Sequence, residues 1–425
     1  MNIETILAEI LEPELLPRLL PTWEQSLREL PQPDAPSFLS PEIVTANREY
    51  CGLSQEFDRP LLEAAQRIRS NPALYRLAWH YDWRIYDSPT FDVARWPRLE
   101  HALGEQAGLF YLLISLDMAP RIRRYHRLLG IPEHITRDTA QQVRCFCENH
   151  QRAHQGRPGA FASQVGWQRN YVRDALYFRL GRLEFWAQPY EKPFTVFRHR
   201  QTGQVVALAN DGLSFNTQGF MDEAEKMAAC SSTWTATLRL DDSAVCGYPI
   251  RPEGCALHEE IRLPFTEWRQ ALCKGDPVLN VHIPSGGDMS LEKCLDSFRQ
   301  ACDFFRAYFP RRAPLAFDCE SWIFSPLLEG ILPPASNLVR LLKETYLLPN
   351  PATGPDALWF VFFQDRFDLA TAPRDTSLQR ALLKYVASGQ EWRNGGMFLL
   401  VDDLEHFGAQ YYRTAWNQDA GFLTP

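Results

Sequence analysis

The side chains best suited to chemistry in this sequence centre on a histidine within an apolar segment. Residues 278–283 (VLNVHI) predict a strand, and the two-residue period of a strand puts Asn280 and His282 on one face. Val281 and Ile283 then point to the opposite face. Histidine titrates near neutral pH, so His282 can act as a general base. A histidine that only completes hydrogen bonds within a core fits the same pattern, and the sequence leaves both interpretations open.

Two carboxylates share one face of a second predicted strand, residues 313–320 (APLAFDCE). Asp318 and Glu320 alternate there with Cys319. Either carboxylate could orient His282 or act as the base itself, whereas Glu320 at the strand end also fits a solvent-exposed position. Cys319 is a conceivable nucleophile, but a cysteine on an apolar strand face is more commonly a small core residue.

The first strand runs into a glycine turn, PSGGDMS at residues 284–290, and a helix is predicted from about residue 290 to 309. Strand, glycine turn and helix N-terminus form a common anion site, because backbone N–H groups without a partner point out of the turn. The same arrangement also serves simply to turn the chain. The carboxylate of Asp288 opposes anion binding but suits a helix N-terminus, and Lys293 in the first helical turn offsets its charge.

Helical periodicity dominates the first part of the chain, residues 1–165. Segments such as FDRPLLEAAQRIRSNPALYRLAWHY repeat apolar residues at three- and four-residue spacing, and prolines fall at the edges, where helices begin or end. The pattern changes after this point. We therefore predict an α-helical N-terminal domain, residues 1–165, and a second domain of different architecture, residues 166–425.

The second domain opens with strands and continues with an alternation of strands and helices. Residues 194–210 and 233–250 each predict a pair of strands around a turn. Ser325 and Pro326 predict a helix N-terminus. Farther on, ALWFVFF at residues 357–363 predicts a buried strand, TSLQRALLKYVAS a helix and GMFLLVDD a final strand. This order predicts an α+β fold, with a mixed β-sheet and flanking helices in the second domain.

Composition and charge argue against several classes of protein. The chain has 425 residues and a net charge of −8, so no nucleic-acid partner is expected, because phosphate binding relies on clustered Lys and Arg. No apolar run approaches the roughly 18 residues that span a bilayer. The acidic N-terminus lacks the features of a signal peptide, and ten cysteines without regular spacing fit reduced thiols. We expect a cytoplasmic protein without a membrane span.

Two thiols and two imidazoles lie within the segment CFCENHQRAH and suggest zinc as an alternative. Cys147, His150 and His154 could share one face of a helix. Cys145, however, diverges from Cys147 by about 200° at helical pitch. We therefore expect no metal site.

The order of elements and several motifs resemble the acyl-CoA-binding core of the GNAT N-acyltransferase superfamily. More narrowly, three features are similar to a bacterial two-domain subfamily of predicted acyltransferases: HIPSGGDMS, then Ser297 with Phe304 and Phe305 on the following helix, and FDCESWIFSP followed by SNL. FRLGRLEFW at residues 178–186 resembles the opening strand of its C-terminal half. That subfamily combines a helical N-terminal domain with a GNAT-like C-terminal domain, and the resemblance covers most of the chain.

The resemblance implies an enzyme that transfers an acyl group from an acyl-CoA thioester directly to an amine. The donor is expected to be acyl-CoA or an acylated carrier protein, and the acceptor a small metabolite or a peptide side chain. The expected catalytic residues are His282, Asp318 and Glu320. The alternative is a binding or regulatory protein that kept the scaffold and lost the chemistry.

The resemblance also implies where the donor lies, with its pyrophosphate on the turn after the core strand and its pantetheine where two strands splay apart. Carried over by position, Val281 and Ile283 would offer backbone hydrogen bonds to the thioester arm. Asn337 resembles the asparagine with which many GNAT proteins contact pantetheine, although a helix N-terminal residue beside a cap at Ser336 fits equally well. The residues expected around the phosphates are Ser285, Gly286, Gly287, Asp288, Met289, Ser290 and Lys293.

Overall fold

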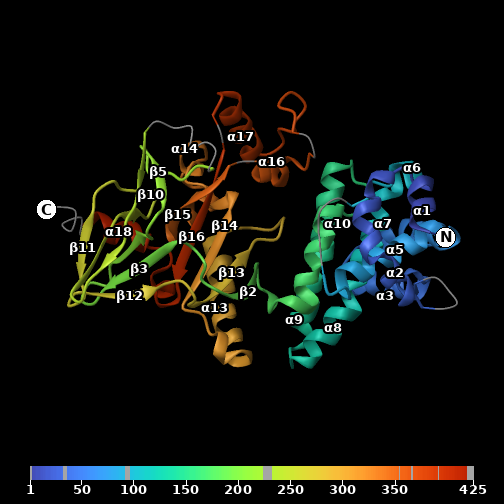
Figure 1. Ribbon diagram of the computed structural model, residues 1–425, viewed down its shortest axis with the longest axis horizontal. Helices are drawn as coiled ribbons and strands as arrows, with labels where there is room; N and C mark the ends of the chain where they lie inside the picture. Colours follow the sequence, from blue (N-terminus) through green and yellow to red (C-terminus); the bar gives the residue numbers. More distant parts are fainter. Residues whose placement is uncertain are drawn as a thin grey trace. The chain divides into compact units, whose positions relative to one another are not determined.

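The computed structural model describes residues 2–31, 36–90, 96–223, 232–353, 355–364, 367–390 and 392–418 (Figure 1). The chain forms two compact units. The first consists of Met1–Leu180 together with Pro284–Gly286, and the second of Gly181–Ile283 together with Gly287–Pro425. The domain boundary that the sequence analysis placed at residue 165 stays a prediction.

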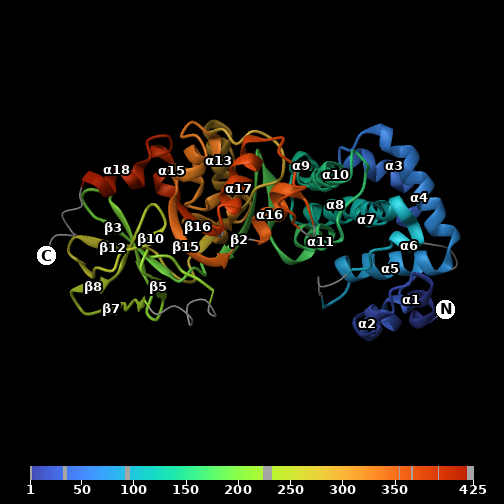
Figure 2. The ribbon, with the colours of Figure 1, turned by 90° about the horizontal axis from the view of Figure 1, so that it is seen from above.

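The first unit is helical, as the periodicity of its sequence predicts (Figure 2). Its helices are α1 (Ile3–Glu9), α2 (Leu16–Arg28), α3 (Pro41–Tyr50), α4 (Asp58–Ser70), α5 (Pro72–Tyr86), α6 (Glu100–Leu103), α7 (Ala107–Leu116), α8 (Met118–Leu128), α9 (Glu133–Ala140), α10 (Gln142–Ala153) and α11 (Ala162–Val165). Strand β1 (Tyr177–Leu180) follows them. Helix α7 is buried on all sides and contacts α3, α4, α5, α10 and α11. A helix that is apolar all round belongs inside a core, and α7 is the centre of this unit.

Local signals in the sequence set the ends of these helices. The side-chain Oδ1 of Asn71 accepts hydrogen bonds from the N–H groups of Ala73 and Leu74, and Pro72 occupies the first position of α5. This is the preferred chemistry of a helix N-terminus, because the capped amides have no partner within the helix. Across the described part of the chain, no helix has the length and apolar character needed to cross a membrane.

The second unit is built on a mixed sheet. In spatial order its strands are β2 (Leu183–Pro189), β13 (Pro277–His282), β14 (Ala316–Ser321), β16 (Arg393–Leu400) and β15 (Tyr346–Thr353). β13 and β14 run parallel, and the other neighbouring pairs run antiparallel. Helix α13 (Leu291–Tyr308) covers one face, where the ring of Phe298 contacts the rings of Phe185 and Phe317. The predicted α+β class and mixed sheet are thus confirmed.

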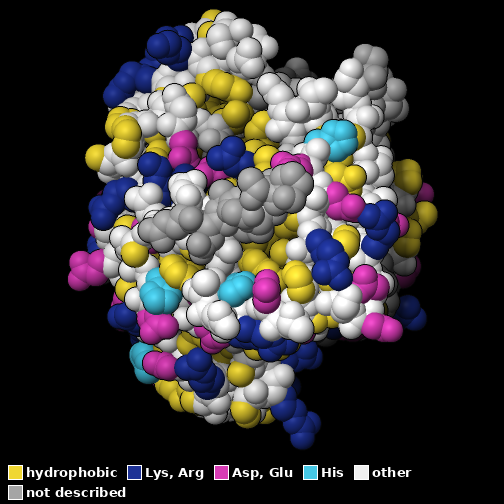
Figure 3. Space-filling model, turned by 90° about the vertical axis from the view of Figure 1, so that its left-hand side faces the viewer, with side chains coloured by type: hydrophobic (Ala, Val, Ile, Leu, Met, Phe, Trp, Pro, Cys, Tyr) yellow, Lys and Arg dark blue, Asp and Glu magenta, His cyan; other side chains and the backbone are white. Residues whose placement is uncertain are grey.

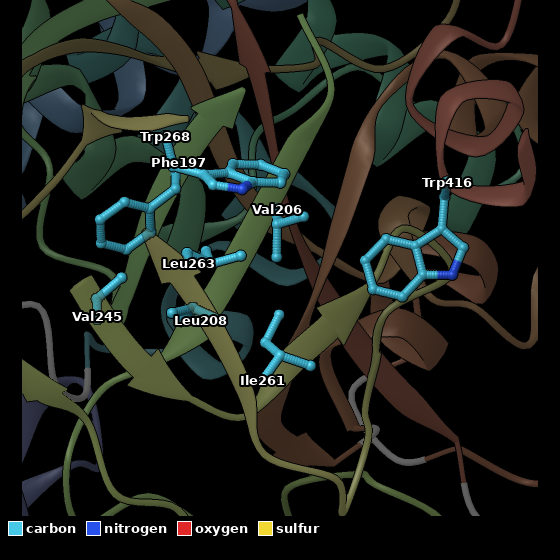
Figure 4. Close-up of a cluster of buried hydrophobic side chains, with 8 residues drawn as sticks. All are labelled: Phe197, Val206, Leu208, Val245, Ile261, Leu263, Trp268 and Trp416. Carbon is cyan, nitrogen blue, oxygen red and sulfur yellow. The ribbon is translucent and has the colours of Figure 1, made fainter. Parts of the chain in front are cut away.

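Smaller antiparallel sheets complete the second unit, in the orders β10-β9-β4-β3-β12, β11-β8-β7 and β5-β6. Their strands are β3 (Phe194–His199), β4 (Val205–Ala209), β5 (Ser214–Asn216), β6 (Thr233–Thr235), β7 (Arg239–Leu240), β8 (Ala244–Gly247), β9 (Pro249–Arg251), β10 (Cys255–Ala256), β11 (Ile261–Pro264) and β12 (Trp268–Leu272). Side chains of these strands and of helix α18 (Tyr411–Gln418) form one apolar cluster (Figure 4): Phe197, Val206, Leu208, Val245, Ile261, Leu263, Trp268 and Trp416. On the face seen in Figure 3, the described Lys and Arg side chains alternate with Asp and Glu and form no extended basic patch.

One predicted strand is wrong. The sequence analysis expected a buried strand at residues 357–363, but this segment belongs to helix α16 (Pro355–Phe362). A short apolar run fits a buried strand and a buried helix equally well. In the structure its burial is one-sided, since Phe360 is 48% exposed whereas Val361 and Phe362 are buried.

The strand in this part of the sheet is β15, which the sequence analysis missed. Its sequence, YLLPNPAT, contains Pro349 and Pro351, which are unfavourable in a central strand because proline cannot donate a ladder hydrogen bond. β15 lies at the edge of the sheet, where its ladder partner is β16. An edge strand tolerates proline, which is why the tertiary position overrides the local signal.

Ser325 and Pro326 do not begin a helix. Ser325 follows a 3-10 turn (Trp322–Phe324), and helix α14 (Leu328–Ile331) begins only after Leu327. A second helix, α15 (Asn337–Glu344), follows separately. The predicted helix farther on is confirmed as α17 (Ser377–Ala387), which starts with a capping box at Thr376.

Candidate active site

The ladder between the two parallel strands ends before the strands do. β13 and β14 pair from Val278 opposite Ala316 to Asn280 opposite Asp318. Beyond this rung, β13 stays paired with β2 through His282, and β14 stays paired with β16 through Ser321. Strands whose mutual pairing stops while each keeps its outer neighbour leave backbone groups facing the point of divergence, where an extended ligand can bind.

His282 stands at this divergence and is held by a buried carboxylate. Its Nδ1 lies 2.7 Å from Oε2 of Glu184, the residue directly opposite it on β2. The side chain of Glu184 is 0% exposed, and that of His282 is 30% exposed. An ionised carboxylate can only accept a hydrogen bond, so with Glu184 ionised Nδ1 is the donor and Nε2 is the ring nitrogen that could take up a proton. The pair therefore has the geometry of a general base and its positioning partner.

Asp318 and Glu320 share the ammonium group of Lys192. Nζ of Lys192 lies 2.8 Å from Oε1 of Glu320 and 3.6 Å from Oδ2 of Asp318. Oδ1 of Asp318 accepts hydrogen bonds from Asn280 at 3.1 Å and from Gln188 at 3.4 Å. Burial raises the pKa of Asp318, although Lys192 and Asn280 act in the opposite direction. The two carboxylates thus form a charge cluster around one lysine.

The orienting carboxylate that the sequence analysis sought for His282 is Glu184, which that analysis did not single out. Asp318 and Glu320 stand on the same face of the sheet, but the contacts described above tie them to Lys192. The signal for Glu184 was present as an acidic residue between the apolar residues Leu183 and Phe185 in the segment FRLGRLEFW. The position of Glu184 opposite His282 is set by the pairing of β2 with β13. The catalytic roles of Asp318 and Glu320 stay predictions.

The two faces of the sheet differ sharply around this point. Cross-strand neighbours share a face, so the register gathers polar side chains on the face opposite α13. The polar side chains on this face are Glu184, Gln188, Asn280, His282, Asp318 and Glu320. Buried polar groups cost free energy unless they are paired, so this concentration marks a site rather than a core.

Cys319 lies on the apolar face and is a core residue. Its thiol donates to the carbonyl oxygen of Val281 at 3.0 Å, in place of a ladder hydrogen bond. Burial raises the pKa of this thiol far above its ordinary value, and a thiol that stays protonated is a poor nucleophile.

The glycine turn after β13 has the backbone conformation that glycine favours. Gly286 and Gly287 have φ angles of 75° and 76°. A Cβ atom on Gly287 would lie 3.1 Å from Nε of Arg182, so the guanidinium group of Arg182 packs directly against this turn. Its backbone N–H donates to Oγ of Ser297 on α13 at 2.7 Å. Arg182 is a cation beside the turn that the sequence analysis did not single out.

The carboxylate of Asp288 closes the turn onto the start of α13. Its Oδ1 accepts from the N–H of Ser290 at 2.9 Å and from Nδ2 of Asn337 at 3.0 Å. Lys293 lies 3.4 Å from Oδ2. Desolvation acts against ionisation, but the hydrogen bonds from Ser290 and Lys293 prevail and lower the pKa of Asp288. Lys293 thus offsets the charge of Asp288, and Asn337 is held at this turn.

The N-terminus of α13 has no side-chain cap. Its N-cap residue, Ser290, makes no capping hydrogen bond, and Met289 before it is buried. Within the described residues, the amides of Gly287 and Met289 donate to no protein acceptor. Free amides at the start of an 18-residue helix attract an anion.

The zinc alternative finds no support in the geometry. Within the residues that the structure describes, no three His, Cys, Asp or Glu side chains converge as metal ligands. His150 instead stacks on His154 with ring centroids 4.1 Å apart, and burial lowers the pKa of His150 to about 4.

Two family models match the sequence. A GNAT-like C-terminal domain matches residues 177–399, and an N-acyltransferase N-terminal domain matches residues 44–173. No curated protein matches the chain.

Solved structures show a similar fold. An acyltransferase in complex with decanoyl-CoA and teicoplanin is 20% identical, with a TM-score of 0.62, over 94% of this chain and 100% of that one. An acyltransferase in complex with CoA and 10C-teicoplanin gives the same values. An acyltransferase in complex with decanoyl-CoA is 22% identical, with a TM-score of 0.59, over 94% of this chain and 99% of that one.

Proposed function

This chain belongs to the family of two-domain GNAT-like acyltransferases, and from this premise we propose that it transfers an acyl group from acyl-CoA directly to an amine. The observation that carries the proposal is the position of the His282–Glu184 pair at the point where β13 and β14 stop pairing. The similar structures with bound decanoyl-CoA support acyl-CoA as the donor, in preference to a carrier protein.

The donor would lie along the divergence and reach the glycine turn. The thioester arm would hydrogen-bond to the backbone of Ile283 and of Val281 at the end of β13. The carbonyl oxygen of Val281 would have to release the thiol of Cys319 to take part. The pyrophosphate would meet the uncapped start of α13 at the amides of Gly287 and Met289. Ser285, Gly286 and Asp288 would contribute through the conformation of the turn.

Two cations would neutralise the phosphates. Arg182 packs against Gly287, and Lys293 stands in the first turn of α13. The amide of Ser290 is engaged by Asp288 and is therefore not counted among the phosphate ligands. Asn337 supports the site by fixing Asp288, and its proposed contact with pantetheine would require it to leave that hydrogen bond.

The chain's own residues would act on the acceptor amine. Nε2 of His282 takes a proton from the amine nitrogen, which attacks the thioester carbon. The N–C bond forms, the C–S bond breaks, and the thiolate of CoA takes up a proton on leaving. Glu184 holds the ring in place and stabilises the imidazolium that forms.

Replacement of His282 tests this proposal. We expect His282→Ala to reduce release of free CoA thiol in the presence of an amine by about 100-fold or more, while CoA binding in a calorimetric titration stays unchanged. The matched control is His258→Ala, because His258 is exposed and stacks on Trp234 elsewhere in the second unit.

Unchanged thiol release in His282→Ala would make His282 structural. CoA binding without any transfer in the wild-type protein would instead favour the non-catalytic alternative.

A further inference from the structure

Lys192, Asp318 and Glu320 form a charge cluster beside the end of the β13–β14 ladder. Two carboxylates surround one ammonium group, and the buried carboxylate of Glu184 stands on the same face of the sheet. Exposure differs along the cluster, since the side chain of Asp318 is 1% exposed and that of Glu320 is 51% exposed. The cluster thus runs from a buried end to an accessible one and carries an excess of negative groups.

The register places the accessible end across the divergence from His282. Asp318 is opposite Asn280 in the last rung that joins β13 and β14. Glu320 lies two residues farther along β14, and His282 two residues farther along β13, on the same face. Because the strands no longer pair there, the carboxylate of Glu320 and the imidazole of His282 stand on opposite sides of the strand divergence.

A polar atom beside the cluster has hydrogen-bonding capacity that no described residue uses. The hydroxyl of Tyr190 is buried without a partner among the described residues. Oδ2 of Asp318 accepts no hydrogen bond and has the ammonium group of Lys192, 3.6 Å away, as its ion-pair partner. Tyr190 lies close enough for electrostatic coupling, because burial and then the charges of Asp318 and Glu320 hold its pKa well above its ordinary value. A buried hydroxyl without a partner beside a charge cluster is a hydrogen-bonding group that a polar ligand could satisfy.

A purely structural role accounts poorly for Glu320. Glu320 makes the shorter contact with Lys192, at 2.8 Å, but Lys192 also has Asp318 as a buried counter-ion at 3.6 Å. Ion pairs with a half-exposed carboxylate contribute little to stability. A second carboxylate adds a negative charge at the accessible end of the cluster, where its main effect is on an incoming molecule.

We infer that Glu320, together with Asp318 and Lys192, forms a subsite that attracts the acceptor as a cation, and that the acceptor is an amine without a carboxylate beside the reacting nitrogen. This inference rests on the proposed function. The protonated amine is drawn to Glu320, gives one proton to Nε2 of His282, and then attacks the thioester carbon as the neutral amine. The second proton that the nitrogen loses as the amide forms passes to the departing CoA thiolate. An α-amino acid is disfavoured, because its carboxylate would meet Glu320 and Asp318.

Matched acceptor pairs that differ by one carboxylate test the inference. We would compare tyramine with tyrosine, and agmatine with arginine, using decanoyl-CoA as donor and measuring both acylation and binding. The wild-type enzyme is expected to prefer each amine over its amino acid by about tenfold or more in kcat/KM. In Glu320→Gln, KM for the amine should rise about tenfold and the preference should shrink, with KM for decanoyl-CoA unchanged.

Glu191→Gln is the control for this experiment. Glu191 is next to Lys192 in sequence, but it is exposed and pairs with Lys274. It should leave the preference for amines intact.

Acylation or binding of both members of a pair to the same extent, or of neither member, overturns the inference. A preference that survives in Glu320→Gln also overturns it. A parallel titration with CoA separates this failure from failure of the proposed function, since the donor site would still bind CoA if only the subsite were wrong.

Discussion

The imidazole of His282 and the carboxylate of Glu184 form a hydrogen bond of 2.7 Å between neighbouring strands of the central sheet. One partner is buried and the other is partly exposed, so the pair connects the interior of the second unit to the divergence of β13 and β14. This relationship gives His282 a fixed ring orientation and gives the proposed reaction its proton acceptor.

Glu184→Gln should keep the shape of the pair and remove its charge. We expect kcat to fall about 100-fold, because the imidazolium that forms during the reaction loses its counter-ion. KM for acyl-CoA should stay the same. Steady-state kinetics would show this, with Glu292→Gln as a control at an exposed position of α13. An equal loss of kcat and of folded protein would reduce Glu184 to a structural role.

Gly287→Ala should weaken CoA binding through Arg182. The new Cβ would lie 3.1 Å from Nε of Arg182 and would push the guanidinium group away from the turn. We expect the Kd for CoA to rise about tenfold, measured by calorimetry.

Gly275→Ala is the matched control for this substitution. Gly275 also has a positive φ angle, 93°, but a Cβ there meets no atom within 4 Å. Both variants carry the same kind of backbone strain, of about 1–2 kcal/mol. A similar loss of CoA affinity in both would attribute the effect to strain and remove Arg182 from the donor site.

Asp288→Asn should strengthen CoA binding. An asparagine keeps the oxygen that accepts from Ser290, but it removes a negative charge beside the phosphates and releases Lys293 from its ion pair. We expect a Kd about threefold lower at low ionic strength, with the gain lost in high salt. Weaker binding would show that the charge of Asp288 is needed to organise the turn.

The first unit should respond to acid through a buried histidine, His126. Burial lowers its pKa to about 4 from 6.5, and its Nδ1 lies 3.0 Å from Oγ1 of Thr136. A folded-state pKa below the unfolded value means that the stabilisation is complete above pH 6.5 and is lost as pH falls toward 4. The variant His126→Gln lacks this titration, so its unfolding free energy should not fall in the same way. The difference in unfolding free energy between the wild type and the variant should therefore shrink by about 1.4 kcal/mol for each unit by which the pH falls in this window.

Urea unfolding of both proteins across this pH range measures the difference directly. A deficit that stays constant with pH would show that His126 has the same protonation equilibrium in the folded and unfolded states.

The helical half, the mixed sheet and the strand, turn and helix at residues 277–308 could be predicted from sequence because their signals are local. Apolar periodicity, capping residues and glycine turns act within a few residues of one another. The same locality explains the errors. The apolar run of α16 has no period that separates helix from strand, and the prolines of β15 are tolerated only because that strand lies at an edge.

The sequence by itself determined which residue types stand on β13 and β14 and on which face of each strand. Only the tertiary structure decided their partners. Register across a sheet is set by packing and by long connections, so the pairing of His282 with Glu184, 98 positions away, leaves no local trace. The same holds for Lys192 beside Asp318 and Glu320, because an ion pair joins side chains that only the folded backbone brings together.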